Sequence, residues 1–164
     1  MSAFELAIHA AAGREYVPYL RRHLRRAREM IKSPLAKMSL VLVGDAPMSR
    51  LHERHMKLSG PTDVLTFPLE TDSRGRATAG EVYVCVPEAR RQARRHGTDV
   101  APELLLYAVH GMLHLSGMDD RTEKDFRRMH RKEDKILARL GVGPVFAPRA
   151  TCSRGKSGRE GAGR

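Results

Sequence analysis

The first half of the chain contains four short stretches that are typical of β-strands. They are rich in apolar and β-branched residues, and two of them alternate between apolar and polar positions. Pro68 is expected to break the third stretch early, because proline cannot donate a ladder hydrogen bond. A polar segment with Gly75 predicts a loop over residues 71–79. The predicted strands are 4–10, 38–43, 64–69 and 80–86.

Five other stretches place apolar residues three and four positions apart, which is the spacing of helices with one buried face. The stretch at 103–116 is apolar on nearly every side, so we expect a buried central helix there. Strands come first and helices dominate the end, which predicts an α+β fold with about four strands and five helices. The predicted helices are 16–31, 47–58, 87–96, 103–116 and 122–140.

Composition predicts one folded domain followed by a basic tail. The chain has 164 residues, of which 41% are hydrophobic, and this is enough for a substantial core. From Pro148 onward the residues are small and polar, and they cannot bury enough apolar surface to offset the entropy of ordering. We therefore expect a single domain at residues 1–147 and a disordered basic tail at 148–164.

The charge balance points to a polyanionic partner. The formal net charge is +11, and nucleic acid is the first class of partner that such a surplus suggests. A solvated basic surface is the alternative, because each basic cluster lies on the polar side of a predicted helix. Phosphate contacts would be tolerant of sequence and sensitive to salt. The candidate RNA-binding residues are Arg21, Arg25, Arg91, Arg94 and Arg95.

The chain shows the features of a cytoplasmic protein. Its two cysteines, Cys85 and Cys152, are far apart, so a disulfide framework is not expected. The N-terminal residues 1–12 lack the basic start of a signal peptide. No apolar run approaches the length of a membrane span. We expect a location in a reducing compartment and no membrane partner.

Two histidines interrupt the apolar helix predicted at 103–116. His110 and His114 are four positions apart, so both imidazoles lie on one face. Gly117 can end the helix in a left-handed turn that brings Asp119 or Asp120 back toward them. Two nitrogens and a carboxylate oxygen leave a divalent metal with an open position, as in catalytic sites. The alternative is a pair of core histidines satisfied by hydrogen bonds.

Gly111 separates this motif from that of the zinc proteases, which carry a glutamate after the first histidine. If water is activated here, either the metal does most of the work or another carboxylate helps, and Asp119, Asp63 and Glu81 are the candidates. A glycine inside a helix costs about 1 kcal/mol relative to alanine. We therefore expect another segment to approach the helix closely at Gly111.

Several separated motifs resemble one known family. They are Pro61–Pro68, Gly80–Val82, His110–Asp119 and the late helix that contains Met129 and Glu133. Together they are similar to the YbeY family of bacterial metal-dependent endoribonucleases, and the resemblance covers roughly residues 4–141. It implies a mixed sheet of four strands flanked by helices. It also implies cleavage of single-stranded RNA in maturation of small-subunit ribosomal RNA and in ribosome quality control.

The resemblance further implies one zinc ion held by three histidines in His-x3-His-x5-His spacing. His110 and His114 match the first two ligands, and Asp120 stands where the family usually has the third. The family also usually has an asparagine and a catalytic arginine at the positions of His52 and Met56. Lys57 could supply the missing positive charge in catalysis, as could Arg54, and Asp119 is the other candidate catalytic residue.

The function that these features predict is a zinc-dependent endoribonuclease acting on ribosomal RNA. One alternative is a non-catalytic RNA-binding or ribosome-assembly factor that keeps the metal for stability. The second alternative is a metalloprotease, which is less favoured because residue 111 is glycine and proteolysis does not call for a net charge of +11. Oligomeric state is not predicted.

Overall fold

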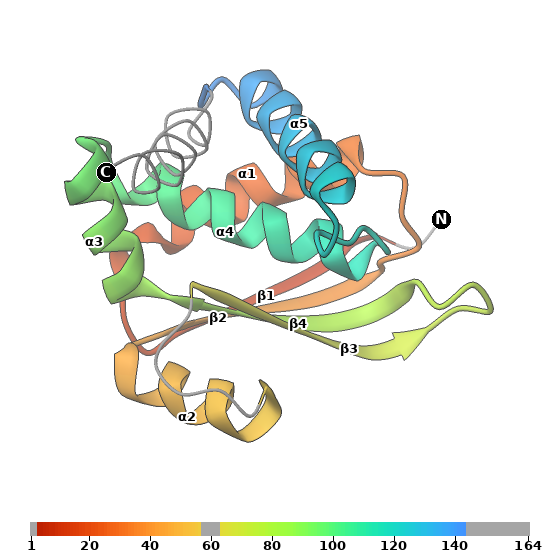
Figure 1. Ribbon diagram of the computed structural model, residues 1–164, viewed down its shortest axis with the longest axis horizontal. Helices are drawn as coiled ribbons and strands as arrows, with labels where there is room; N and C mark the ends of the chain where they lie inside the picture. The colour runs from red at the N-terminus through yellow and green to blue at the C-terminus, as the bar shows by residue number, and fades with distance from the viewer. Residues whose placement is uncertain (1–2, 57–62, 144–164) are drawn as a thin grey trace, which may run out of the picture.

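The computed structural model describes residues 3–56 and 63–143. A four-stranded sheet forms the middle layer, with helices on both faces (Figure 1). Helix α2 (Asp45–Met56) covers one face alone. The other face carries four helices, and α5 packs on α4 rather than on the sheet. These four are α1 (Val17–Met30), α3 (Val86–His96), α4 (Val100–Leu115) and α5 (Glu123–Arg139).

The sheet is mixed, as the family resemblance implies. Its order is β1-β2-β4-β3, in which β1 pairs with β2 and β2 with β4 in parallel. Strand β3 pairs antiparallel with β4 at one edge. The predicted α+β fold is therefore confirmed, and a short 3-10 helix, Arg14–Tyr16, precedes α1. The strands are β1 (Glu5–Ala10), β2 (Lys37–Val43), β3 (Val64–Thr71) and β4 (Ala77–Cys85).

The prediction that Pro68 interrupts its strand is wrong. Strand β3 runs through Pro68, which lies opposite Gly80, and the register shifts after it, between Pro68 and Glu70 and again between Glu70 and Thr71. An edge strand tolerates proline because one of its sides needs no hydrogen-bond partner. The loop predicted over 71–79 is shorter in the structure, because β3 ends at Thr71 and β4 begins at Ala77. In the tight turn between them, the Asp72 carboxylate accepts backbone hydrogen bonds of 2.9 Å from Arg74 and Arg76.

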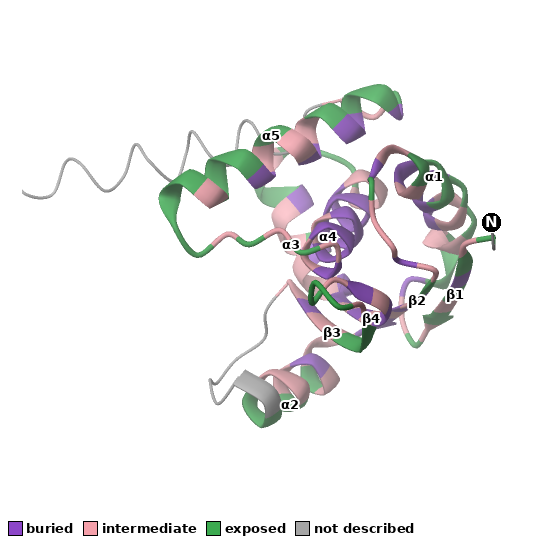
Figure 2. Cartoon of the chain, turned by 90° about the vertical axis from the view of Figure 1, so that its right-hand side faces the viewer, coloured by how far each residue is buried: buried purple, intermediate pink, exposed green. Residues whose placement is uncertain are grey.

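Helix α4 is the centre of the core, as its apolar sequence predicts. It lies between the sheet and α5 and also packs against α1 and α3. Viewed along the sheet, α4 is the most completely buried helix (Figure 2). Leu104 to Val109 are all buried along it. This burial matters for the site because His110 and His114 belong to the same helix.

Gly111 allows α4 to approach the sheet closely, as its position in a helix predicted. A Cβ atom built on Gly111 would lie 2.6 Å from Cγ1 of Val82 and 3.0 Å from Cγ2 of Thr66. These two side chains project from β4 and β3 respectively. The segment that approaches the helix is therefore the sheet, and the glycine holds the two histidines at a defined height above it.

Replacing Gly111 with alanine should lower the free energy of unfolding by about 1–2 kcal/mol. A Cβ contact as short as 2.6 Å puts the cost of overpacking in the upper part of its usual range, about 2–3 kcal/mol. The better helix propensity of alanine returns about 1 kcal/mol. Urea unfolding would measure the change. Gly44→Ala is the control, because a Cβ there meets nothing within 4 Å. Equal stability of the Gly111→Ala protein and the wild type would contradict the packing argument.

Within residues 3–56 and 63–143, no helix is both long and apolar enough to cross a membrane. The cytoplasmic location stays a prediction. The tail predicted at 148–164 lies outside the described residues, so the division into a domain at 1–147 and a tail also stays a prediction.

Candidate metal centre

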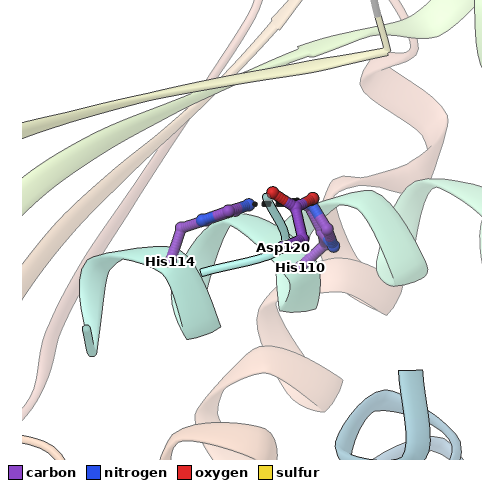
Figure 3. A group of neighbouring side chains, drawn as sticks. All are labelled: His110, His114 and Asp120. Carbon is purple, nitrogen blue, oxygen red and sulfur yellow. Dashed lines mark hydrogen bonds and ion pairs between the residues drawn. The ribbon is translucent and has the colours of Figure 1, made fainter. Parts of the chain in front are cut away.

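Three side chains that the sequence singled out converge at the end of α4. Nε2 of His110 lies 3.0 Å from Nε2 of His114. Oδ2 of Asp120 lies 3.5 Å from each of these nitrogens. Figure 3 shows the Asp120 carboxylate facing both imidazoles from the segment that follows the helix. In the part of the chain that is described, this is the one group of three such side chains that could hold a metal ion.

The turn after α4 is what brings Asp120 back toward the histidines. Gly117 adopts a positive φ of 101°, a conformation that glycine reaches without steric cost. The amide of Met118 donates to the carbonyl of Leu113 at 3.1 Å, which closes the end of the helix. The predicted role of Gly117 is therefore confirmed, and the reversal places Asp120 rather than Asp119 beside the imidazoles.

Asp119 supports this turn instead of facing the histidines. Its Oδ1 accepts a hydrogen bond of 2.8 Å from the backbone amide of Asp120. Its Oδ2 pairs with Nε of Arg121 at 3.2 Å, and the side chain is largely exposed. The contacts of Asp119 position the backbone of Asp120. Its predicted catalytic role stays a prediction.

A buried carboxylate on α5 lies behind the cluster. Glu133 has no exposed side-chain surface, and its carboxylate accepts a hydrogen bond from Nδ1 of His110. Its second oxygen lies 3.1 Å from Nδ1 of His130. A proton on Nδ1 of His110 leaves the lone pair on Nε2, which points toward His114 and Asp120. The carboxylate thus sets both the tautomer and the orientation of the first candidate ligand.

Sequence reasoning did not identify Glu133 and His130 as site residues. The available signal was a carboxylate in an apolar stripe, because Glu133 is spaced with Met129, Ile136 and Leu137 on the buried face of α5. A charged residue on such a face is rarely buried unless it is paired. Its partner lies 23 positions away on another helix, so the pairing depends on how α5 packs against α4.

The pKa shifts agree with this geometry. Burial alone would lower the pKa of His110, but the hydrogen bond to Glu133 and the charges of Glu133 and Asp120 outweigh it and raise the pKa. Burial, followed by the neighbouring His110, lowers the pKa of His114. Burial opposes ionisation of Glu133, yet its hydrogen bonds to His110 and His130 lower its pKa. Glu133 is therefore a carboxylate, and His114 favours the neutral form that can act as a ligand.

The donor set fits a divalent metal such as zinc. In a tetrahedral zinc site with bonds of about 2.0–2.2 Å, neighbouring ligand atoms are about 3.3–3.5 Å apart. The separations here are 3.0, 3.5 and 3.5 Å. Two imidazoles and one carboxylate are ordinary zinc ligands, and three protein ligands leave one position open. The buried Glu133 behind His110 matches the carboxylate–histidine arrangement of metal sites.

Of the two other carboxylates that the sequence offered as catalytic bases, Asp63 lies near the cluster and Glu81 points away from it. Asp63 immediately precedes β3, and its charge helps to raise the pKa of His110, so it lies near the cluster. Glu81 alternates along β4 with the buried Val82, whose side chain faces α4. Glu81 therefore points to the face of the sheet that α2 covers, and the structure argues against it as a base at this site.

The described arginines that the sequence singled out for RNA binding lie on helices other than α4. Arg21 and Arg25 lie on α1, and the exposed Arg94 and Arg95 lie on α3. Lys57 lies outside the described residues, and the side chain of Met56 is likewise not described. The RNA-binding and catalytic roles of these residues stay predictions.

Arg91 has a structural role of its own. Its guanidinium forms two hydrogen bonds with the Asp45 carboxylate, at 2.7 and 3.0 Å, and a third with Glu88 at 2.8 Å. These contacts join α3 to the start of α2 across the end of the sheet. Two carboxylates offset its charge, and the RNA-binding role of Arg91 stays a prediction.

The same network makes Cys85 unreactive. Its thiol is buried and donates to Oδ1 of Asp45 at 3.3 Å. Burial raises the pKa of the Cys85 thiol to about 11, and only the thiolate is a strong nucleophile. In a Cys152→Ser protein at pH 8, iodoacetamide should label Cys85 at least about 100-fold more slowly than in urea. Mass spectrometry would measure the rates, and rapid labelling of the folded protein would contradict this assignment.

Comparisons with known proteins place the chain among relatives of one name. The sequence profile of the family described as Endoribonuclease YbeY matches residues 9–141. Endoribonuclease YbeY of Saccharopolyspora erythraea is 39% identical over 135 residues, which are 77% of this chain and 74% of that protein. The Acidothermus cellulolyticus protein of the same name is 40% identical over 115 residues, covering 63% of this chain and 70% of the relative.

A solved structure shares the fold. The solution structure of TM1509 from Thermotoga maritima aligns with a TM-score of 0.60 and 24% sequence identity. The alignment covers 94% of this chain and 98% of that one. The likeness supports the order of strands and helices described above. The profile match and the relatives together show that the chain belongs to the YbeY family of endoribonucleases.

Proposed function

We propose that this protein is a zinc-dependent endoribonuclease that cleaves single-stranded RNA during maturation of small-subunit ribosomal RNA and in ribosome quality control. The convergence of His110, His114 and Asp120 on one point, with Glu133 buried behind His110, carries the proposal. Membership of an endoribonuclease family supports RNA as the substrate class. The net charge of +11 agrees with a polyanionic substrate.

Each residue of the cluster would have a different role in binding a metal ion. A zinc ion bound there would supply Lewis acid chemistry to a phosphodiester and lower the pKa of a coordinated water. His110 and His114 offer neutral imidazole lone pairs, and Asp120 offers an anionic oxygen. Glu133 keeps Nε2 of His110 aimed at the cluster. Asp63 is a further carboxylate whose charge acts on His110, after those of Glu133 and Asp120.

Two observations argue against a metalloprotease. The position after the first histidine is Gly111. Side chains of the sheet occupy the space that a Cβ atom would need there, so no general base can be placed at this position. The sequence relatives are named as endoribonucleases. The non-catalytic alternative keeps the metal for stability alone. It predicts a metal-loaded protein that binds RNA without cutting it.

The direct test combines metal analysis with two substrates. Purified protein should contain one equivalent of zinc by mass spectrometry and should cleave a single-stranded ribosomal RNA fragment. A chelator should abolish cleavage, and zinc should restore it. Casein, offered in parallel, should remain intact. Stoichiometric metal without RNA cleavage would favour the non-catalytic alternative, and casein cleavage without RNA cleavage would favour a protease.

Asp120 offers a test that depends on charge. In Asp120→His the site loses one negative charge, so a coordinated water should ionise more easily and the metal-binding positions should remain three. The acidic limb of the pH profile of kcat/KM should then move to lower pH by about one unit or more, because a nearby unit charge is worth about 1–4 kcal/mol. A shift to higher pH, or none, would contradict the role of Asp120 as a ligand.

A further inference from the structure

A groove lined by cations lies beside the metal centre. It has a volume of about 430 Å³ and is bounded by the end of α1, the end of α4 and the length of α5. Leu113 and Met118 contribute apolar surface to it. No aspartate or glutamate lines it among the described residues. Its cationic side chains are Lys32, Arg128, Arg131, Lys132 and Lys135.

The charges in this groove are not compensated within the described ranges 3–56 and 63–143. Elsewhere, Arg91 pairs with Asp45, and on α5 itself Arg127 pairs with Glu123. None of the five groove cations forms an ion pair with a described acidic residue. Gathering like charges around a concave surface raises the local potential for an anion. The groove therefore differs from an ordinary solvated face, on which basic residues alternate with acidic partners.

The groove shares a wall with the metal centre. Ser116 and Met118 line it, and the same turn continues directly to Asp120. On α5, Lys132 lines the groove while its neighbour Glu133 is buried against His110. A polymer bound in the groove could therefore continue over this turn to the cluster of histidines.

We propose that this groove binds the phosphate backbone of single-stranded RNA on one side of the bond that is cut. The inference rests on the proposed function for the identity of the polymer. Four of the cations follow the spacing 128, 131, 132 and 135 along α5, a row of about 10 Å. Such a row suits the regularly spaced charges of a nucleic-acid backbone better than an irregular acidic protein surface. Binding here is tolerant of sequence, because phosphate contacts position the strand without reading bases.

The test compares two double variants with the same loss of charge. Lys132→Gln/Lys135→Gln removes two groove cations. Lys37→Gln/Arg90→Gln removes two exposed cations that pair with Glu5 and Glu15 on other elements. Fluorescence anisotropy measures binding of a 2′-O-methyl single-stranded RNA, which resists cleavage, over a range of salt concentrations. Circular dichroism confirms that both variants are folded.

The groove variant should bind this RNA roughly 10-fold more weakly near 0.1 M salt, and the slope of log K against log salt should fall in magnitude by about 1.4, or about 0.7 per lost contact. The control should stay within about two-fold of the wild type. Equal losses in both variants would overturn the groove proposal, as would an unchanged slope. A groove variant that loses binding to polyglutamate but keeps RNA binding would also overturn it, in favour of an acidic protein partner.

Cleavage of the unmodified RNA by the wild type is measured separately and tests the proposed function alone. If the wild type cleaves RNA and the slope is unchanged, the groove proposal fails and the function stands. If the slope changes as expected and the wild type does not cleave, the function fails and the groove stands.

Discussion

A His114→Ala protein should remain folded and lose more than about 100-fold of its RNA cleavage, together with stoichiometric metal binding. Removing an outer partner of a metal ligand already costs about 10–100-fold, and His114 supplies one of the three candidate ligand atoms found among the described residues. Its side chain is one-quarter exposed and its pKa is lowered, so the fold does not depend on its charge. Metal content and single-turnover cleavage of a single-stranded RNA would be measured together.

His9→Ala is the matched control for this experiment. His9 is an exposed histidine on β1, and the substitution is chemically the same. The control should retain metal and activity within about two-fold of the wild type. Full activity of a metal-free His114→Ala protein would contradict the assignment of the cluster as a catalytic metal centre. Unchanged metal content would contradict His114 as a ligand.

Two substitutions of Glu133 should distinguish its contribution to zinc affinity from its contribution to the stability of the fold. Glu133→Gln keeps the shape of the side chain but loses the charge that orients His110, so zinc affinity should fall about 10–100-fold. Glu133→Ala also leaves Nδ1 of His110 and of His130 without this partner in a buried site. Breaking such a buried pair costs about 3–5 kcal/mol of stability. Isothermal titration with zinc and urea unfolding of the chelated protein would measure the two effects.

Glu123→Gln provides the control on the same helix. Glu123 is exposed and pairs with Arg127, an arrangement worth about 0.3–0.5 kcal/mol. Its loss should leave zinc affinity unchanged. The Glu133 argument would be wrong if Glu133→Gln bound zinc like the wild type, or if Glu133→Ala unfolded at the same urea concentration as Glu123→Gln.

The local patterns predicted most of the elements and the first part of the site. Alternating and three-to-four spacing located four strands and five helices, because these periods follow from backbone geometry. The placement of His110 and His114 on one face, and the turn at Gly117, were predicted for the same reason. Both depend on residues fewer than ten positions apart. Pro68 was misjudged because its tolerance depends on β3 being an edge strand.

The contacts between distant segments could not be predicted from spacing. Glu133 meets His110 across 23 positions, and Arg91 meets Asp45 across 46. In each case the partner of a charged side chain on a helix is set by how distant elements pack together, and local spacing does not reveal it. The basic residues of α5 likewise formed one cluster in the sequence. Folding places Arg127 in an ion pair with Glu123 and four others in an uncompensated groove.

The sequence by itself therefore determined the α+β class and the helix that carries the histidines, and the residue spacing left Asp119 and Asp120 as candidates for the next ligand. Only the tertiary structure decided that Asp120 faces the imidazoles, that Glu133 supports them and that some arginines are already neutralised. The physical reason is the range of the interactions. Helix and turn geometry is set within a few residues, whereas burial and charge pairing are set by which surfaces pack together.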